Sequence, residues 1–344
     1  MFIPWSRQRQ AWCLQASATG VCRRWLRIAP ASLLAALPAL DSVLYLPLAA
    51  CGPELSALPR GLLVETPQLA LLLRVRWLMA VSVIAVDGPR EWIDGLDRTG
   101  QPCVRLRLAT GDAALVALHG AQVLSWTAGG VERLYLSPRA VMDGQTAIRG
   151  GIPLCLPQFN QRGPLVKHGF ARHLPWAPGP VRVEGSEIAA EFGLTHSEAS
   201  LAVWPHAFAV TLAVRLGVGR LQLDFSVHNT GSAALNFTLA LHSYLRVGDI
   251  AGVRLDGLYG QPVWDSVADQ RTQQAGPPRF AGEFDRVYQA AAGPLMLSDA
   301  AHKLRIAQSP NFGQTVVWNP GAAHCATLAD MPPGGVEMLD ALPV

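Results

Sequence analysis

The chain has 344 residues, of which 50% are apolar, and its formal net charge at pH 7 is only +3. A chain of this length and apolar content can bury a large core, so its composition excludes a disordered protein. Its charged residues are dispersed, whereas a nucleic-acid-binding protein concentrates cations on one face, so we predict no nucleic acid as a partner.

The first eighty or so residues differ from the rest in composition. They contain apolar runs such as "IAPASLLAALPAL" and "LALLLRVRWLMAVSVIAV". Prolines and charged residues interrupt these runs, whereas a membrane-spanning helix needs about 20 mostly apolar residues. The apolar stretch also lies too far from Met1 for a typical signal peptide. We therefore predict an extension over residues 1–80, with Met79 as a candidate natural start, and a functional domain over residues 81–344 with no membrane anchor.

The cysteines and histidines give no sign of a metal site. No two cysteines form a Cys-x-x-Cys pair, which favours reduced thiols in a cytoplasmic protein over a disulfide framework. His168 and His173 are five residues apart and do not form the helical i, i+4 zinc pair. The glycine-rich dinucleotide and P-loop motifs are also missing from the sequence. We predict neither a metal nor a cofactor.

From about Leu106 onward, short apolar runs alternate with Gly, Pro, Asn and Asp. The stretch "LQLDFSVHN" has the period of two that indicates a half-buried antiparallel strand. Glycine-containing turns in "VGRLQ" and "HNTGSAALN" predict hairpin connections. These patterns predict an all-β domain, either a sandwich or a barrel.

Four segments place ionisable residues among glycines, prolines and aromatic residues: "AIRGGIPLCLPQF", "KHGFARHLPW", "LALHSYLRVGDI" and "GEFDRVYQ". Burying a charge is costly, so these residues must pair with each other or face a ligand. Strand alternation predicts that Leu239 and Leu241 lie on one face, and that Ala240, His242 and Tyr244 lie on the other. A lone histidine in such a strand is more often a hydrogen-bonded core residue than a catalytic one, so this motif alone leaves its role open.

Taken together, "HGAQVLSW", "RGGIPLCLPQF", "HGFAR", "LHSYLRVGDI", "FDRVY" and "VVWNPG" resemble the glucose-6-phosphate 1-epimerase branch of the aldose 1-epimerase (galactose mutarotase-like) superfamily. The resemblance runs from about residue 90 to the C-terminus. It implies a large antiparallel β-supersandwich. It also implies an isomerase of carbohydrate metabolism that interconverts the α and β anomers of a hexose 6-phosphate without a cofactor. The expected substrate is glucose 6-phosphate, and the expected protein is a cytoplasmic monomer.

The same resemblance implies a role for each matched residue. His242 matches the family histidine that acts on the ring oxygen, and an imidazole with its ordinary pKa of about 6.5 has both protonation states accessible near neutrality. Arg149, His168 and Arg172 match residues that line the sugar-phosphate pocket, and Asp285 matches an aspartate that contacts the substrate. Without the resemblance, an ion pair would be the simpler explanation for Arg149 and a local turn contact for Asp285.

Lys167 and His173 fall outside the matched positions, so we expect them to be solvated loop residues.

The C-terminal sequence departs from the family pattern. Family members carry a catalytic glutamate on their last strand, whereas aligning "ADMPPGGVEMLDALPV" places Leu342 at that position. Glu337 comes too early in this alignment, and Asp340 has a shorter side chain. We therefore expect a truncated or altered C-terminal end and a missing general base. Two other functions stay open: a non-catalytic sugar-phosphate-binding or regulatory protein, and a carbohydrate-binding protein tethered to a membrane by its apolar N-terminus.

Overall fold

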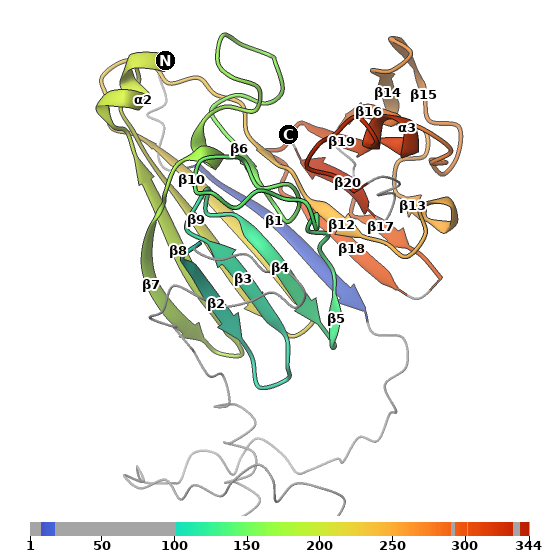
Figure 1. The fold of residues 1–344 in the computed structure, drawn as a ribbon, viewed down its shortest axis with the longest axis horizontal. Helices are drawn as coiled ribbons and strands as arrows, with labels where there is room; N and C mark the ends of the chain where they lie inside the picture. The colour runs from blue at the N-terminus through green and yellow to red at the C-terminus, as the bar shows by residue number, and fades with distance from the viewer. Residues whose placement is uncertain (1–7, 18–100, 290–292, 301, 333–337, 344) are drawn as a thin grey trace, which may run out of the picture. The chain divides into compact units, whose positions relative to one another are not determined.

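Antiparallel β-sheets form nearly all of the regular structure in the part of the chain that the computed structural model describes, which is residues 8–17, 101–289, 293–300, 302–332 and 338–343 (Figure 1). All of these residues belong to one compact unit. The predicted all-β supersandwich is confirmed, since the few helical segments are short: η4 (Ala171–His173), α2 (Glu198–Val203), η5 (Ile250–Gly252) and α3 (Gly321–Cys325).

The largest sheet has eight strands. In spatial order they are β13 (Arg254–Asp256), β17 (Leu295–Ser298), β18 (Lys303–Gln308), β1 (Gln8–Ser17), β10 (Arg220–Asn229), β9 (Phe208–Gly217), β8 (Glu187–Thr195) and β7 (Ala177–Glu184). The period-two pattern of "LQLDFSVHN" forms β10, where Leu221, Leu223 and Phe225 are buried. The predicted turn in "VGRLQ" connects β9 to β10.

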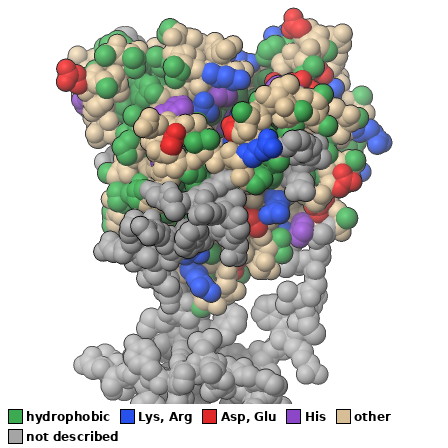
Figure 2. Space-filling model, viewed as in Figure 1, with side chains coloured by type: hydrophobic (Ala, Val, Ile, Leu, Met, Phe, Trp, Pro, Cys, Tyr) green, Lys and Arg blue, Asp and Glu red, His purple; other side chains and the backbone are tan. Residues whose placement is uncertain are grey.

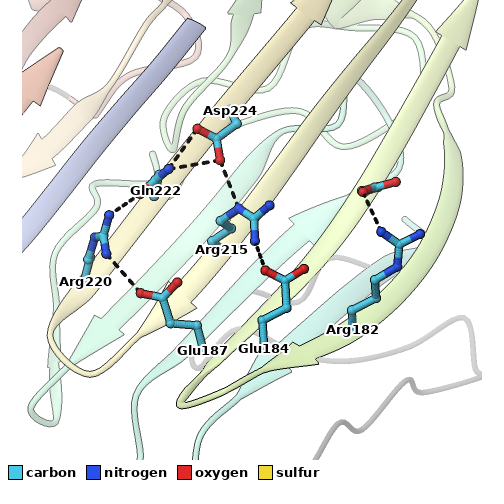
Figure 3. A network of polar contacts seen from close by, with 8 residues as sticks. Arg182, Glu184, Glu187, Arg215, Arg220, Gln222 and Asp224 are labelled. Atoms are coloured by element: carbon cyan, nitrogen blue, oxygen red, sulfur yellow. Dashed lines mark hydrogen bonds and ion pairs between the residues drawn. The ribbon is translucent and has the colours of Figure 1, made fainter. Parts of the chain in front are cut away.

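Ion pairs cross the polar face of this sheet, some between adjacent strands and some between strands that are one strand apart (Figure 3). Arg215 on β9 pairs with Glu184 near β7's end and with Asp224 on β10, and Arg220 pairs with Glu187. The side chains are partly exposed, so each pair contributes about 0–1 kcal/mol to stability. This network therefore serves mainly to keep one face of the sheet polar while the other face is packed.

The packed face lies against a four-stranded sheet of β2 (Cys103–Arg107), β3 (Ala113–Ala117), β4 (Val123–Ala128) and β5 (Val131–Glu132), which is drawn in front of it in Figure 1. One apolar core joins the two layers. It contains Val116 and Trp126 from the small sheet together with Phe192 and Phe225 from the large one. Interdigitation of two inner faces in this way is the usual packing of a β-sandwich.

A six-stranded sheet carries the C-terminal part of the chain. Its spatial order is β12 (Tyr244–Arg246), β20 (Met338–Pro343), β19 (Gln314–Asn319), β16 (Phe284–Gln289), β14 (Pro262–Asp265) and β15 (Gln270–Gln273). A two-stranded ladder of β6 (Leu154–Cys155) and β11 (Ala240–Leu241) precedes β12.

The hairpin predicted at "HNTGSAALN" is wrong. The chain leaves β10 in the eight-stranded sheet and next forms β11, which pairs with β6 in a different sheet. The turn residues are present, since Asn229 accepts a hydrogen bond from the Gly231 backbone, but they start a crossover between sheets.

Strand β1 lies inside the segment that was predicted to be an extension. Its backbone pairs with β10 on one side and with β18 on the other, so residues 8–17 occupy an interior position of the largest sheet. Residues 18–80 lie outside the described residues, and the predicted domain boundary stays a prediction. Within the described residues, no helix is long and apolar enough to cross a membrane.

The position of β1 predicts a specific sensitivity to proline. Cys13 faces Gln222 on β10 and Ala307 on β18, so its backbone N–H belongs to an interior ladder. We expect Cys13→Pro to lower the free energy of unfolding by about 1–3 kcal/mol, because it removes that donor and leaves a buried acceptor unpaired. Cys13→Val keeps the N–H and is the control in urea unfolding. Equal midpoints for the two variants would show that residues 8–17 contribute no strand.

Candidate active site

His242 and Tyr244 lie side by side on one face of the β11–β12 segment. Their rings stack with centroids 4.8 Å apart and an interplanar angle of 21°. The His242 backbone N–H donates to the Pro153 carbonyl at 2.9 Å, which fixes the segment against the chain before β6. Leu239 and Leu241 point into the main core, so the predicted alternation of the two faces is confirmed.

A tight turn brings the "HGFAR" segment to this histidine. The His168 ring meets the His242 ring edge-on, with centroids 5.5 Å apart. Its Nδ1 accepts a hydrogen bond from the Asn160 backbone N–H at 3.2 Å. The next residue must be glycine, because a Cβ on Gly169 would lie 2.1 Å from the Leu156 carbonyl oxygen and the residue has a φ of +68°. The glycine of the motif therefore allows the close approach that positions His168.

Arg149 joins the histidine face to the C-terminal part of the chain. Its Nη1 donates to the Tyr244 hydroxyl at 3.0 Å, and its Nε pairs with the Asp330 carboxylate at 2.9 Å. Burial opposes the charged form, but Tyr244 and Asp330 together raise the pKa of Arg149 above its ordinary value. Arg149 therefore forms an ion pair, which was the simpler explanation for this residue without the family resemblance. It also lies beside the histidines of the site.

Arg172 is positioned by the short helix η4. Its Nη2 donates to the Lys167 carbonyl at 3.0 Å, and its Nε is buried with no hydrogen-bond partner. Within the described residues it pairs with no carboxylate, in contrast to Arg149. Lys167 is exposed, and His173 contacts the Gln145 carbonyl at 3.0 Å, so both lie in the loop around the site.

Asp285 lies on the same sheet as Tyr244 but further from the histidines. It pairs with Trp318, and Trp318 pairs with Asp340, which pairs with Tyr244, so these four positions form one row across the sheet. Burial raises the pKa of the Asp285 carboxyl above its ordinary value. The structure places Asp285 on the face that carries the site, and its predicted contact with substrate stays a proposal.

Both histidines are held in the neutral form by their surroundings. Burial lowers the pKa of His168 to about 3, and the nearby cations Arg172, Lys167 and Arg149 act in the same direction. Burial also lowers the pKa of His242 well below its ordinary value, with His168, Arg149 and Arg172 adding to the shift. The expectation that the pKa of His242 is near 6.5 is therefore wrong in the ligand-free protein.

Sequence reasoning missed three residues of the site. Tyr244 could have been found, because it lies two residues after His242 on the same strand face. Trp318 approaches His242 edge-on at 6.3 Å and lies in the quoted "VVWNPG" stretch. Asp330 pairs with an arginine 181 residues earlier, and nothing local in the sequence predicts such a contact.

Strand β20 contains the position where the sequence alignment predicts that the general base is missing. Asp340 is the residue that pairs with Tyr244 on one side and Trp318 on the other, and Leu342 pairs with Val316. Residues two apart share a face of a strand, so Asp340 and Leu342 lie on the face of the sheet that carries Tyr244. Glu337 lies outside the described residues.

Comparison with known proteins places this geometry in context. A family model described as "Aldose 1-epimerase" matches residues 102–337. A protein of Cenchrus ciliaris named "Putative glucose-6-phosphate 1-epimerase" is 38% identical over 244 residues, which is 67% of this chain and 74% of that protein.

Two solved structures are similar as well. The crystal structure of a "putative mutarotase (YeaD)" from Salmonella typhimurium has 30% sequence identity and a TM-score of 0.64, and the match covers 79% of this chain and 90% of that one. A "galactose mutarotase-like protein" from Clostridium acetobutylicum has a TM-score of 0.54 at 15% identity, with 71% and 85% covered, and shows the fold alone.

The neutral histidines predict a loss of stability in mild acid. The pKa of His168 is lower in the folded state than its ordinary value of about 6.5, so below that pH the unfolded chain binds more protons and stability falls until about pH 3. We expect His168→Asn to flatten this fall by up to about 1.4 kcal/mol per pH unit in urea unfolding at pH 7.5, 6 and 5. Asparagine at the exposed His228 is the control. An unchanged slope in His168→Asn would contradict the assignment.

Proposed function

This chain belongs to the aldose 1-epimerase family, and on that premise we propose that it interconverts the α and β anomers of a hexose 6-phosphate. The proposed main substrate is glucose 6-phosphate, and the reaction proceeds by acid/base ring opening and closure. It is an isomerase on the mutarotase fold. The observation that supports a phosphorylated substrate is the position of two arginines beside the paired histidines. Arg149 and Arg172 both lower the pKa of His242, so an anion bound between them would relieve an unfavourable charge balance.

The two arginines have different roles in this proposal. Arg149 is held by Tyr244 and Asp330, so its charge is already partly compensated. Arg172 makes its guanidinium hydrogen bond to a backbone carbonyl and pairs with no carboxylate among the described residues. We therefore assign the substrate phosphate mainly to Arg172, because a guanidinium binds two phosphate oxygens through its planar donors. Arg149 then orients Tyr244 and the histidine that stacks on it.

The reaction needs two proton transfers. Ring opening delivers a proton to the ring oxygen and removes one from the anomeric hydroxyl, and closure on the other face reverses both transfers. His242 is the group we assign to the ring oxygen. In the ligand-free site burial lowers the pKa of His242 well below its ordinary value. The negative charge of a bound phosphate would raise the pKa of His242 toward neutrality, where an imidazole can both give and accept a proton.

The second proton acceptor must come from the same face. Asp285 and Asp340 occupy the row that Tyr244 and Trp318 define. Asp340 is the nearer of the two in strand order, because β20 is the direct neighbour of β12. A carboxylate one strand away from Tyr244 is suited to accept the proton of the anomeric hydroxyl, although its side chain is shorter than that of the family glutamate.

We further propose a monomer that acts in the cytoplasm on a small-molecule sugar phosphate and binds no nucleic acid. The sequence contains no Cys-x-x-Cys pair, which supports a reducing compartment. Among the described residues no group of three His, Cys, Asp or Glu side chains could hold a metal ion.

The function is tested directly by exchange NMR between the anomers of glucose 6-phosphate, with glucose as the comparison substrate. His242→Asn should reduce enzymatic exchange to the spontaneous rate, because a positioned acid/base group contributes about 10² to 10⁴-fold and its loss leaves no donor at the ring oxygen. Binding of glucose 6-phosphate by calorimetry should persist in this variant. Undiminished exchange would remove His242 from the mechanism, and equal rates for glucose in the parent would exclude a phosphate pocket.

The last strand provides a second test. We expect Leu342→Glu to raise the exchange rate at least tenfold over Leu342→Gln, because it places a longer carboxylate at the family position and a general base contributes about 10² to 10⁴-fold. Asp340→Asn should lower the rate of the parent. If the parent is fully active and Glu337→Gln alone abolishes exchange, Glu337 is the base and the assignment to β20 fails.

A further inference from the structure

A cavity of about 640 Å³ lies at the outer edge of the six-stranded sheet. We call it the Trp264 pocket. Its walls come from β14, β15, β16 and β19 and from the loop that precedes "HGFAR", and its polar lining includes Arg162, Trp264, Arg271, Gln273, Gln289 and Gln314. None of the residues assigned above to sugar-phosphate binding or catalysis lines it.

The charged residues that line this pocket are all positive. Its lining contains two arginines and no carboxylate. The guanidinium carbons of Arg162 and Arg271 each lie 5.6 Å from the centre of the Trp264 ring, so one indole gathers both cations. Within the described residues neither arginine forms an ion pair. Arg162 donates only to the Gln314 side chain at 3.5 Å.

The polar face of the eight-stranded sheet shows the contrasting arrangement. There Arg215 lies between Glu184 and Asp224, so its charge is balanced by the protein itself (Figure 3). The polar groups that line the Trp264 pocket beside its two cations are neutral: an indole, side-chain amides and the Thr272 hydroxyl. Planar guanidinium donors with neutral amide neighbours are suited to bind carboxylate or phosphate oxygens.

Trp264 is held in a fixed orientation. Its Nε1 donates to the Asp269 carboxylate at 2.9 Å, outside the cavity lining, and it packs beside the buried cluster of Val287, Val316 and Phe159. The polar edge of the indole is therefore occupied, and the ring surface is the part that faces a ligand. A fixed ring positions the two flexible arginines at little additional entropic cost.

The pocket is connected to the active site through one loop. Phe159, which belongs to the cluster beside Trp264, lies 5.2 Å from the His168 ring between centroids. Arg162 follows three residues later in the loop that the Asn160–His168 hydrogen bonds close. Arg162 and His168 therefore belong to the same loop.

We propose that the Trp264 pocket is a second anion-binding site, separate from the sugar-phosphate pocket, that takes the phosphate or carboxylate group of a small molecule between Arg162 and Arg271. Its two cations supply the charge, and Gln273, Gln289 and Gln314 supply neutral hydrogen-bonding groups around it. Both probes, inorganic phosphate and succinate, carry this chemistry, and they distinguish a phosphate site from a carboxylate site.

The experiment is calorimetric titration of the full-length protein with each probe. Arg172→Gln is introduced first, to weaken phosphate binding at the sugar-phosphate pocket. We expect one site to remain in this background and to weaken at least tenfold when Arg162 and Arg271 are both replaced by glutamine, because each charge-assisted contact is worth about tenfold or more in affinity. Binding is measured without reference to anomer exchange, so a failure of the proposed function leaves this test intact.

The matched control removes two exposed arginines elsewhere. Arg182→Gln with Arg254→Gln changes the net charge equally, and these residues pair with Glu191 and Asp256 outside the cavity. This control should leave the remaining site unchanged. An equal loss in both double variants would show unspecific attraction, and no binding of either probe in the Arg172→Gln background would show that no second site exists. Either result overturns the proposal.

Discussion

The arrangement of the site depends on one half-buried cation, Arg149, which bonds to Tyr244 and Asp330 at the same time. These two partners come from distant parts of the chain, one from β12 and the other from the segment after α3. A partly buried guanidinium needs both contacts to compensate for its desolvation. By meeting that need, the chain brings its C-terminal region beside the ring on which His242 stacks.

Burial and nearby cations together lower the pKa values of the two histidines of the site. Burial has the larger effect, and Arg149 and Arg172 add to it for both rings. Histidine and Lys or Arg side chains also lie next to each other near the upper edge of the face shown in Figure 2. A substrate with two negative charges would reverse the balance, so binding and acid/base readiness are coupled. A neutral hexose would bring no such compensation.

The parts of this structure that the sequence predicts are those controlled by local patterns. Strand β10 and the opposite faces of Leu241 and His242 follow from alternation along the chain. The hairpin at "HNTGSAALN" was wrong because turn residues specify a change of direction but not the sheet in which the next strand pairs. The partnership of Arg149 with Asp330 and the interior position of β1 depend on contacts far apart in sequence, and no periodicity encodes them.

The alternation of side chains along β20 limits which of its residues can lie on the same face of the sheet as Asp340. Asp340 pairs with Tyr244, so any residue an even number of positions away on a regular strand shares its face, and Leu342 does so. The proposed role of Asp340 as the second acid/base group rests on this register, because within residues 338–343 Asp340 is the acidic residue and its backbone pairs with Tyr244.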